Sequence, residues 1–217
     1  MEIVVVGATG PTGVEVCRLA LAAGHTVRAT SRHGKALPLP DSDSLRVVPA
    51  DAVTGEGLPD AVAGADAVLS VLGAPYSRHP ITVYSTGTRG IIDAMREVGR
   101  GNRLVVVSSG LTYPPPRDHG FVADRIAFPF LRKVLGRTLY ADMRRMEELV
   151  RASRDIEWTI MRPGRLVNAE SVSKYRLDLD VPTQNCTSRV DLAAAMVAEL
   201  DTVQHVYQAI APTTTRR

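Results

Sequence analysis

The chain has 217 residues, 45% of them hydrophobic, with 26 Lys and Arg against 23 Asp and Glu and a formal net charge of +3. So small an excess of positive charge argues against a nucleic-acid partner, while the hydrophobic content suffices for a sizeable core. Apolar runs stay well below the roughly 18 residues that span a bilayer, so we expect no membrane segment.

The first expected element is a buried strand over residues 3–6, because this run is short, apolar and β-branched. A glycine-rich turn over residues 7–13 follows it and leads into a helix over 14–23. Glycine allows a tight turn and close approach of a phosphate, and the first N–H groups of the helix attract anions. The turn therefore predicts a dinucleotide-binding corner. Its expected cofactor contacts are Gly7, Thr9, Gly10, Pro11, Thr12 and Gly13.

Strand and helix patterns alternate along the rest of the chain. Alternation predicts right-handed βαβ units, and strands that are apolar throughout predict a sheet covered on both faces. We therefore expect an α/β fold, a doubly wound parallel sheet of the Rossmann type in three layers, α/β/α. The expected strands are 25–31, 45–49, 67–71, 104–107, 158–161 and 206–210, and the expected helices are 57–64, 83–98, 138–153 and 189–200.

The residues that follow each strand are candidate ligand contacts, because ligands of such sheets bind beyond the carboxyl ends of the strands. Most of these residues are glycines, small hydroxyl residues or charged residues. Turns favour the same residue types, so the whole set is more informative than any one loop. The predicted cofactor contacts among them are Ser31, Arg32, Asp51, Ala52, Leu72, Gly73, Ser108 and Pro163.

The end of the second strand predicts which nucleotide binds. A site for NAD usually carries an acid here, bonded to the ribose 2′-hydroxyl, but no carboxylate occurs between Glu15 and Asp41. Arg32 can instead form a forked contact with a 2′-phosphate, to which Ser31 can donate. The sequence therefore favours NADP(H) over NAD(H). Asp51 either accepts a hydrogen bond from the adenine amino group or caps a turn, and both interpretations stay open.

Four motifs together indicate a family. They are Gly7-Ala-Thr-Gly-Pro-Thr-Gly13, Leu104-Val-Val-Val-Ser-Ser-Gly110, Trp158-Thr-Ile-Met-Arg-Pro-Gly164 and Ser188-Arg-Val-Asp-Leu-Ala193. With them the chain resembles the atypical short-chain dehydrogenases/reductases, of the NAD(P)H-binding type that includes biliverdin-IXβ/flavin reductases and NmrA-like proteins. The resemblance implies the fold and a nicotinamide cofactor. It implies less about the reaction, because the family includes reductases, isomerases and proteins that only sense nucleotides.

The resemblance also implies candidate catalytic residues. Typical members of the superfamily use a Tyr with a Lys four residues later, and here Tyr140 is followed by Arg144. This implies Tyr140 as proton donor and Arg144 at the nicotinamide ribose, with a half-buried aromatic and a surface charge as the alternative. Ser109 resembles the superfamily's catalytic Ser, or it caps its loop. Tyr113 is a rival proton donor, or an aromatic packed over the prolines that follow it.

Two stretches are expected to form a small substrate-side lobe of a single domain over residues 1–217. Residues 112–137 form an insertion with a strongly apolar stretch over 121–135, and we expect a lid over the nicotinamide pocket that favours a flat or lipophilic substrate. The alternative is a stretch that packs on the sheet or contacts another subunit, so the protein is expected to be a monomer or a homodimer. Residues 165–187 are expected to be irregular.

The sequence thus predicts an NADPH-dependent oxidoreductase that transfers hydride to a carbonyl, enone, quinone or flavin-like small molecule. Two alternatives stay open, an NADP-binding isomerase or cyclase without net redox change and an NmrA-like nucleotide-sensing regulator. Cys17 and Cys186 lie far apart without metal-ligand spacing, so no metal site is expected and a reducing compartment is favoured. No signal-peptide pattern precedes the first strand, so we expect a cytoplasmic protein.

Overall fold

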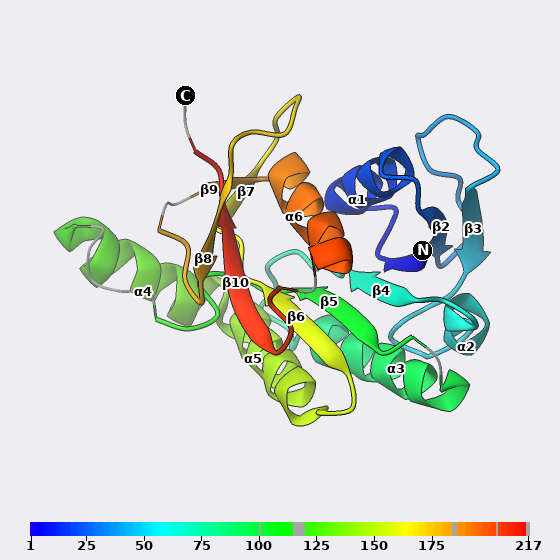
Figure 1. Cartoon of the computed structure of the whole chain (residues 1–217). Helices are drawn as coiled ribbons and strands as arrows, with labels where there is room; N and C mark the ends of the chain where they lie inside the picture. Colours follow the sequence, from blue (N-terminus) through cyan, green and yellow to red (C-terminus); the bar gives the residue numbers. More distant parts are fainter. Residues whose placement is uncertain (100, 115–119, 184–185, 203, 216–217) are drawn as a thin grey trace.

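The computed structural model describes residues 1–99, 101–114, 120–183, 186–202 and 204–215. An eight-stranded sheet in the order β3-β2-β1-β4-β5-β6-β10-β8 forms its centre (Figure 1). The order reverses between β1 and β4, as in a Rossmann fold. The strands of this sheet are β1 (Glu2–Val6), β2 (Thr26–Ser31), β3 (Leu45–Pro49), β4 (Ala67–Ser70), β5 (Arg103–Val107), β6 (Glu157–Met161), β8 (Arg176–Leu179) and β10 (Gln208–Thr213).

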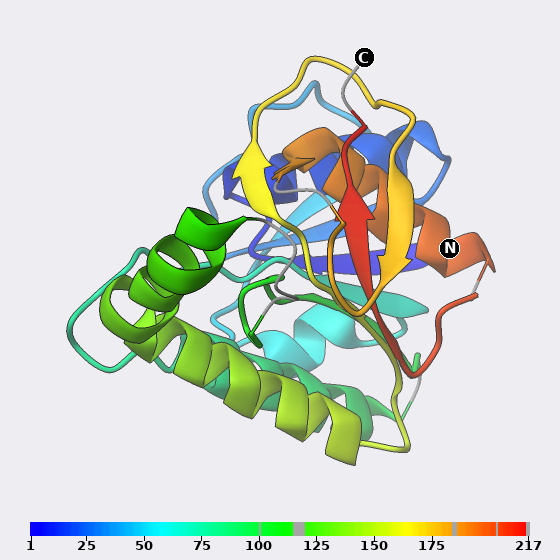
Figure 2. The same cartoon turned by 90° about the vertical axis from the view of Figure 1, so that its left-hand side faces the viewer.

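Helices cover both faces of the sheet (Figures 1 and 2). On one face α1 (Pro11–Ala22) packs against α6 (Arg189–Thr202), and on the other α3 (Val83–Val98) packs against α5 (Arg137–Ala152) and α2 (Leu58–Val62). One hydrophobic core contains buried residues of α2, α3 and α5, and the second contains those of α1 and α6. The predicted three-layer α/β/α arrangement is therefore confirmed.

Neighbouring strands from β3 to β10 run parallel, as predicted, but the edge strand β8 is antiparallel to β10. The expectation that residues 165–187 are irregular is therefore wrong. This stretch also contains β7 (Arg165–Val167) and β9 (Cys186–Ser188), which pair with each other in parallel. All three strands have at most four residues, and β8 alternates polar and apolar side chains at an edge, so they lack the long apolar run of a doubly covered strand.

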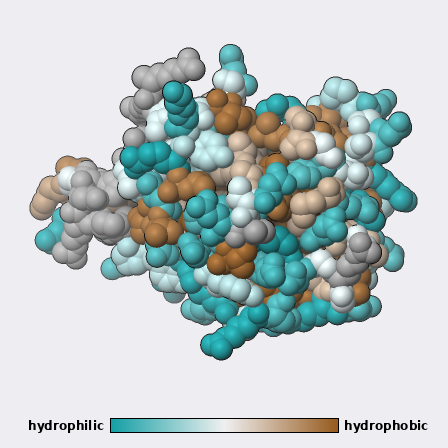
Figure 3. All heavy atoms as spheres, viewed as in Figure 1, coloured by the Kyte–Doolittle hydropathy of each residue, from teal (hydrophilic) through white to brown (hydrophobic). Residues whose placement is uncertain are grey.

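A helical segment precedes α5 and projects from the body of the molecule (Figures 1 and 2). It consists of η1 (Ala123–Ala127), α4 (Phe128–Phe130) and η2 (Leu131–Leu135). Apolar and hydrophilic side chains lie next to one another on its surface (Figure 3), and Ile126, Phe130 and Val134 are exposed. In the described ranges, every helix is too short or too polar to traverse a bilayer.

Candidate functional site

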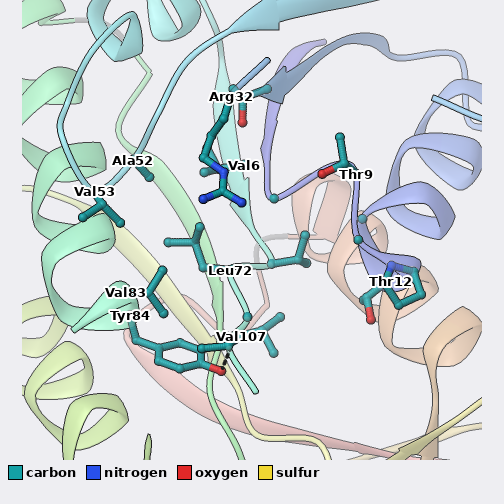
Figure 4. Close-up of a pocket in the computed structure, with 18 of the residues that line it drawn as sticks. Val6, Thr9, Thr12, Arg32, Ala52, Val53, Leu72, Val83, Tyr84 and Val107 are labelled. Atoms are coloured by element: carbon teal, nitrogen blue, oxygen red, sulfur yellow. Dashed lines mark hydrogen bonds between the residues drawn. The ribbon is translucent and has the colours of Figure 1, made fainter. Parts of the chain in front are cut away.

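A cavity of about 560 Å³ lies at the carboxyl ends of the parallel strands, at the point where the strand order reverses (Figure 4). Ligands of doubly wound sheets bind at this point, and the volume suits a small molecule. We call it the nucleotide cavity. The predicted cofactor contacts that line it are Gly7, Thr9, Gly10, Pro11, Thr12, Gly13, Ser31, Arg32, Asp51, Ala52, Leu72, Gly73 and Ser108.

The turn between β1 and α1 forms one wall of the cavity, and its three glycines have different roles. Gly7 has a φ of +85°, and a Cβ on Gly13 would collide with the Gly7 carbonyl oxygen. A Cβ on Gly10 would meet no protein atom closer than 3.5 Å. The fold itself therefore needs glycine at positions 7 and 13. At position 10 the missing side chain leaves room for a group that does not belong to the chain.

The start of α1 provides an anion site beside Gly10. Gly10 is the N-cap of this helix, no side chain caps it, and its first turn contains no acidic residue. Its first N–H groups therefore lie at the cavity without a side-chain acceptor and carry partial positive charge. Thr9 and Thr12 line the cavity next to them (Figure 4). This corner fits a phosphate group.

Arg189 reaches the same cavity from the start of α6. Its Nη1 donates to Asn168 Oδ1 at 2.9 Å, whereas its Nε is buried and has no partner in the described part of the chain. A buried donor without an acceptor is costly, so this nitrogen is suited to an acceptor from a bound ligand. Because α1 and α6 pack together, Arg189 adds a cation to the cavity that the start of α1 also lines.

The motif around Arg189 anchors the start of α6. Ser188 caps the helix, because its Oγ accepts the N–H of Asp191 at 3.0 Å. The buried Asp191 carboxylate accepts the N–H and the O–H of Ser173, at 2.7 and 2.8 Å, and the O–H of Thr214. Burial alone would raise the pKa of Asp191, but these hydrogen bonds together hold it below its ordinary value. Arg189 is thereby fixed at the cavity wall.

Arg32, Ser31 and Asp51 lie where β2 and β3 end. The exposed Arg32 extends its guanidinium into the cavity (Figure 4). Ser31 Oγ accepts the N–H of Lys35 at 2.9 Å, which leaves its O–H available to a ligand. Asp51 Oδ1 accepts the N–H of Val53 at 2.7 Å, so this oxygen caps a turn, as one of the two interpretations predicted.

Ser108 lines the cavity, but its hydroxyl belongs to a buried network. It donates to Glu147 Oε1 at 2.6 Å and lies 2.9 Å from Thr112 Oγ1. The Glu147 carboxylate also pairs with Arg162, whose guanidinium lies 4.7 Å from the centre of the Tyr113 ring. Burial and the charge of Glu147 raise the pKa of Tyr113, and Arg162 offsets part of that rise. Tyr113 is therefore protonated at neutral pH and stacked against Arg162.

Tyr140 is buried near the start of α5, with its hydroxyl 3.0 Å from that of Tyr76 and in contact with the Ser109 side chain. Gly136 makes room for the ring, because a Cβ there would collide with it. Burial and the bond to Tyr76 raise the pKa of Tyr140 well above its ordinary value, so the phenol stays protonated at neutral pH. Arg144, four residues later, lines a different cavity.

Some residues predicted from the sequence lie outside the lining of the nucleotide cavity. The predicted lid does not line the nucleotide cavity in its described residues, 112–114 and 120–137. Five predicted site residues do not line it either. The lid's helical segment instead projects from the body. The five residues are Ser109, Tyr113, Tyr140, Arg144 and Pro163. Tyr113 packs against Arg162, which pairs with Glu147. Tyr140 lines the other cavity together with Arg144, and Ser109 contacts the Tyr140 hydroxyl. The carbonyl of Pro163 accepts the Gly110 N–H at 2.9 Å.

Several residues that line the cavity were not predicted from the sequence. They belong to elements that are brought to the cavity by tertiary packing. The Ser188–Ala193 motif contains Arg189, but the motif did not indicate that Arg189 lines the cavity. These residues include Val83, Tyr84, Met143, Leu166 and Arg189. The described side chains contain no cluster of three His, Cys, Asp or Glu that could hold a metal ion.

A family model described as NAD(P)H-binding matches residues 7–202. An oxidoreductase from Lactococcus lactis is 18% identical with a TM-score of 0.81, over 100% of this chain and 92% of that chain. A predicted NADH-flavin reductase from Streptococcus pneumoniae is 23% identical with a TM-score of 0.74, and the match covers 99% of this chain and 100% of that chain. A short-chain dehydrogenase/reductase from Veillonella parvula in complex with NADP is 17% identical with a TM-score of 0.76, and the match covers 98% of this chain and 94% of that chain. These structures show likeness of fold.

Proposed function

The chain belongs to the NAD(P)H-binding family, and from that premise we propose that it is an NADPH-dependent oxidoreductase. Its acceptor is a small carbonyl, enone, quinone or flavin-like molecule. The observation that carries the proposal is the corner at Gly10, where an open glycine and the uncapped start of α1 meet in a cavity that Arg189 also lines. The two negative charges of a dinucleotide pyrophosphate suit this corner.

Arg32 supports the phosphorylated cofactor. Its guanidinium extends into the cavity from the end of β2, and the O–H of Ser31 is available beside it. A guanidinium forms forked, charge-assisted bonds with a phosphate, whereas a 2′-hydroxyl needs an acceptor such as a carboxylate. The adenosine end of the cavity thus favours NADP(H) over NAD(H).

Bound in this cavity, the nicotinamide would supply a hydride, and the acceptor would take up that hydride and one further proton from an acid or from water. We assign this proton to Tyr140, because its hydroxyl contacts Tyr76 and Ser109, and Ser109 directly follows Ser108 of the nucleotide cavity. We assign Ser109 the role of positioning this hydroxyl. Tyr113 is a weaker candidate, since its ring is stacked against Arg162. Flavin-like and quinone-like acceptors could also take the proton from water.

Two measurements on the purified protein test the proposal. Calorimetric titration with NADPH and NADH should show binding of both, with NADPH the tighter ligand. Stopped-flow mixing of the NADPH-loaded protein with quinones, flavins and enones should then oxidise the cofactor with at least one acceptor. Turnover without NADPH oxidation would instead favour the isomerase or cyclase. Nucleotide binding without any turnover would favour the nucleotide-sensing regulator. The cytoplasmic location and the monomeric or dimeric state stay predictions.

A further inference from the structure

A second cavity, of about 400 Å³, lies between η2 and α5 and is lined by Arg132, Lys133, Arg137, Tyr140 and Arg144. We call it the cationic cavity. Four of its five lining residues carry a positive charge, and none carries a negative one. Its volume is in the range of cavities that hold small organic ligands. None of its lining residues belongs to the nucleotide cavity.

No described carboxylate neutralises the charges of this cavity. Elsewhere on α5, Arg145 pairs with Asp142 at 3.1 Å and Arg151 with Glu147 at 3.9 Å. In the described part of the chain no carboxylate forms an ion pair with the four cations of the cavity, and Arg132 Nε donates to the carbonyl of Leu111 at 3.0 Å. Burial and the charge of Arg144 lower the pKa of Arg132, as expected for like charges held close together.

Tyr140 connects the cationic cavity to the candidate reaction centre. Its side chain lines the cationic cavity, and its hydroxyl contacts Ser109, which directly follows Ser108 of the nucleotide cavity. The hydroxyl also bonds to Tyr76, which follows Pro75 of the same wall. A ligand in the cationic cavity would therefore lie against the side chain of the proposed proton donor.

We propose that the cationic cavity binds an anionic oxygen group of the hydride acceptor, a carboxylate or a phosphate, and so selects an anionic acceptor over its neutral analogue. This inference rests on the proposed function and adds the charge of the substrate to it. It also assigns Arg144 to the substrate instead of the nicotinamide ribose. Cations that lack carboxylate partners gain most from an anion that neutralises them, and forked guanidinium groups match carboxylate and phosphate oxygens.

Riboflavin and FMN are suitable probes, because they differ by one phosphate group. Their binding is followed by quenching of flavin fluorescence, with and without saturating NADP⁺, so the measurement needs no turnover. We expect FMN to bind about tenfold more tightly than riboflavin, with a preference that weakens as salt is added. Arg137→Gln/Arg144→Gln should abolish the preference and leave riboflavin binding unchanged. Lys133→Gln/Arg137→Gln, which changes only exposed side chains, should reduce it while the protein stays folded.

Arg125→Gln is the matched control, because Arg125 is an exposed cation of η1 that does not line the cavity. It should keep the full preference for FMN. Equal affinity for the two flavins, no binding of FMN, or an unchanged preference in both double variants would overturn the proposal. NADPH titration of the same samples separates the two hypotheses. NADPH binding without an FMN preference overturns only the cationic cavity, whereas an FMN preference without NADPH binding supports the anion site and overturns the proposed function.

Discussion

The carboxylate of Glu147 and the guanidinium of Arg162 form an ion pair that is almost completely buried behind the nucleotide cavity. Glu147 comes from α5, and Arg162 directly follows β6. The same carboxylate accepts the hydroxyl of Ser108 at the end of β5. One side chain of a helix thus connects two neighbouring strand ends, which fixes the wall of the site.

Replacing Glu147 should therefore destabilise the protein strongly. Glu147→Gln leaves Arg162 buried, with the exposed Asp180, 3.2 Å away, as its one acidic partner among the described residues. Breaking a buried ion pair costs about 3–5 kcal/mol, and we expect a loss near the lower end, measured by urea unfolding. The double change Glu147→Met/Arg162→Met removes both charges and should recover most of the lost free energy. A loss in the double variant equal to the sum of the losses in Glu147→Met and Arg162→Met would show that the pair is not coupled.

The corner at Gly10 makes a matched pair of glycine variants informative. Gly10→Ala should leave the unfolding midpoint unchanged, because φ of −78° suits alanine and the Cβ meets no protein atom closer than 3.5 Å. Its affinity for NADPH should fall by about tenfold or more, since the Cβ takes the space of the phosphate. Gly13→Ala should instead unfold more easily, by about 1–3 kcal/mol, because its Cβ collides with the backbone. Calorimetry and thermal unfolding on both variants check this contrast.

Replacing Arg32 should reduce the preference of the protein for NADPH over NADH. Arg32→Gln removes a charge-assisted bond worth about 1.5–3 kcal/mol, so we expect NADPH to bind about ten- to a hundredfold more weakly. NADH, which lacks the 2′-phosphate, should bind as before. The variant should be as stable as the original protein, because Arg32 is exposed. Parallel titrations with both nucleotides give the answer, and an equal loss for both would contradict the assignment to the 2′-phosphate.

Replacing Arg189 should weaken the binding of NADPH and NADH equally, whereas replacing Arg32 should weaken only that of NADPH. We assign its unpartnered Nε to the pyrophosphate, which NADPH and NADH share. Arg189→Gln should weaken both by about tenfold, in the range of one charge-assisted hydrogen bond. Arg165→Gln, which changes an exposed arginine outside the lining of the cavity, serves as control and should bind both nucleotides normally. A variant that loses affinity for NADPH alone would place Arg189 at the 2′-phosphate instead.

Asp191 should make stability depend on pH in the acidic range. Its pKa is lower in the folded protein than in the unfolded chain, so its contribution is fully present above the unfolded value of about 4. The contribution should be lost as the pH falls from that value through the lower folded pKa. Asp191→Asn should cost about 2 kcal/mol or more at neutral pH, and the difference should shrink below pH of about 4. Unfolding by urea at neutral and acidic pH measures it, and a difference that does not change with pH would exclude this role.

Local patterns in the sequence predicted most of the fold. The apolar run before Gly7, the glycine turn and the helix after it follow from residues that are neighbours in the chain, and the structure confirms all three. Arg32 lines the cavity because it directly follows its strand, and its contact with the cofactor stays a prediction. The short strands β7, β8 and β9 escaped prediction, because a strand at a sheet edge or in a two-stranded ribbon needs no continuous apolar run.

The sequence alone determined the βα corner, the parallel sheet and the carboxyl ends of the strands at which the nucleotide cavity lies, because these depend on residues that are close in the chain. The tertiary structure decided which distant side chains reach that edge. Packing of α6 against α1 brings Arg189 to the nucleotide cavity. Because η2 packs beside α5, Arg144 lines the cationic cavity between them. Such neighbours are set by how helices pack in space, which no spacing along the chain records.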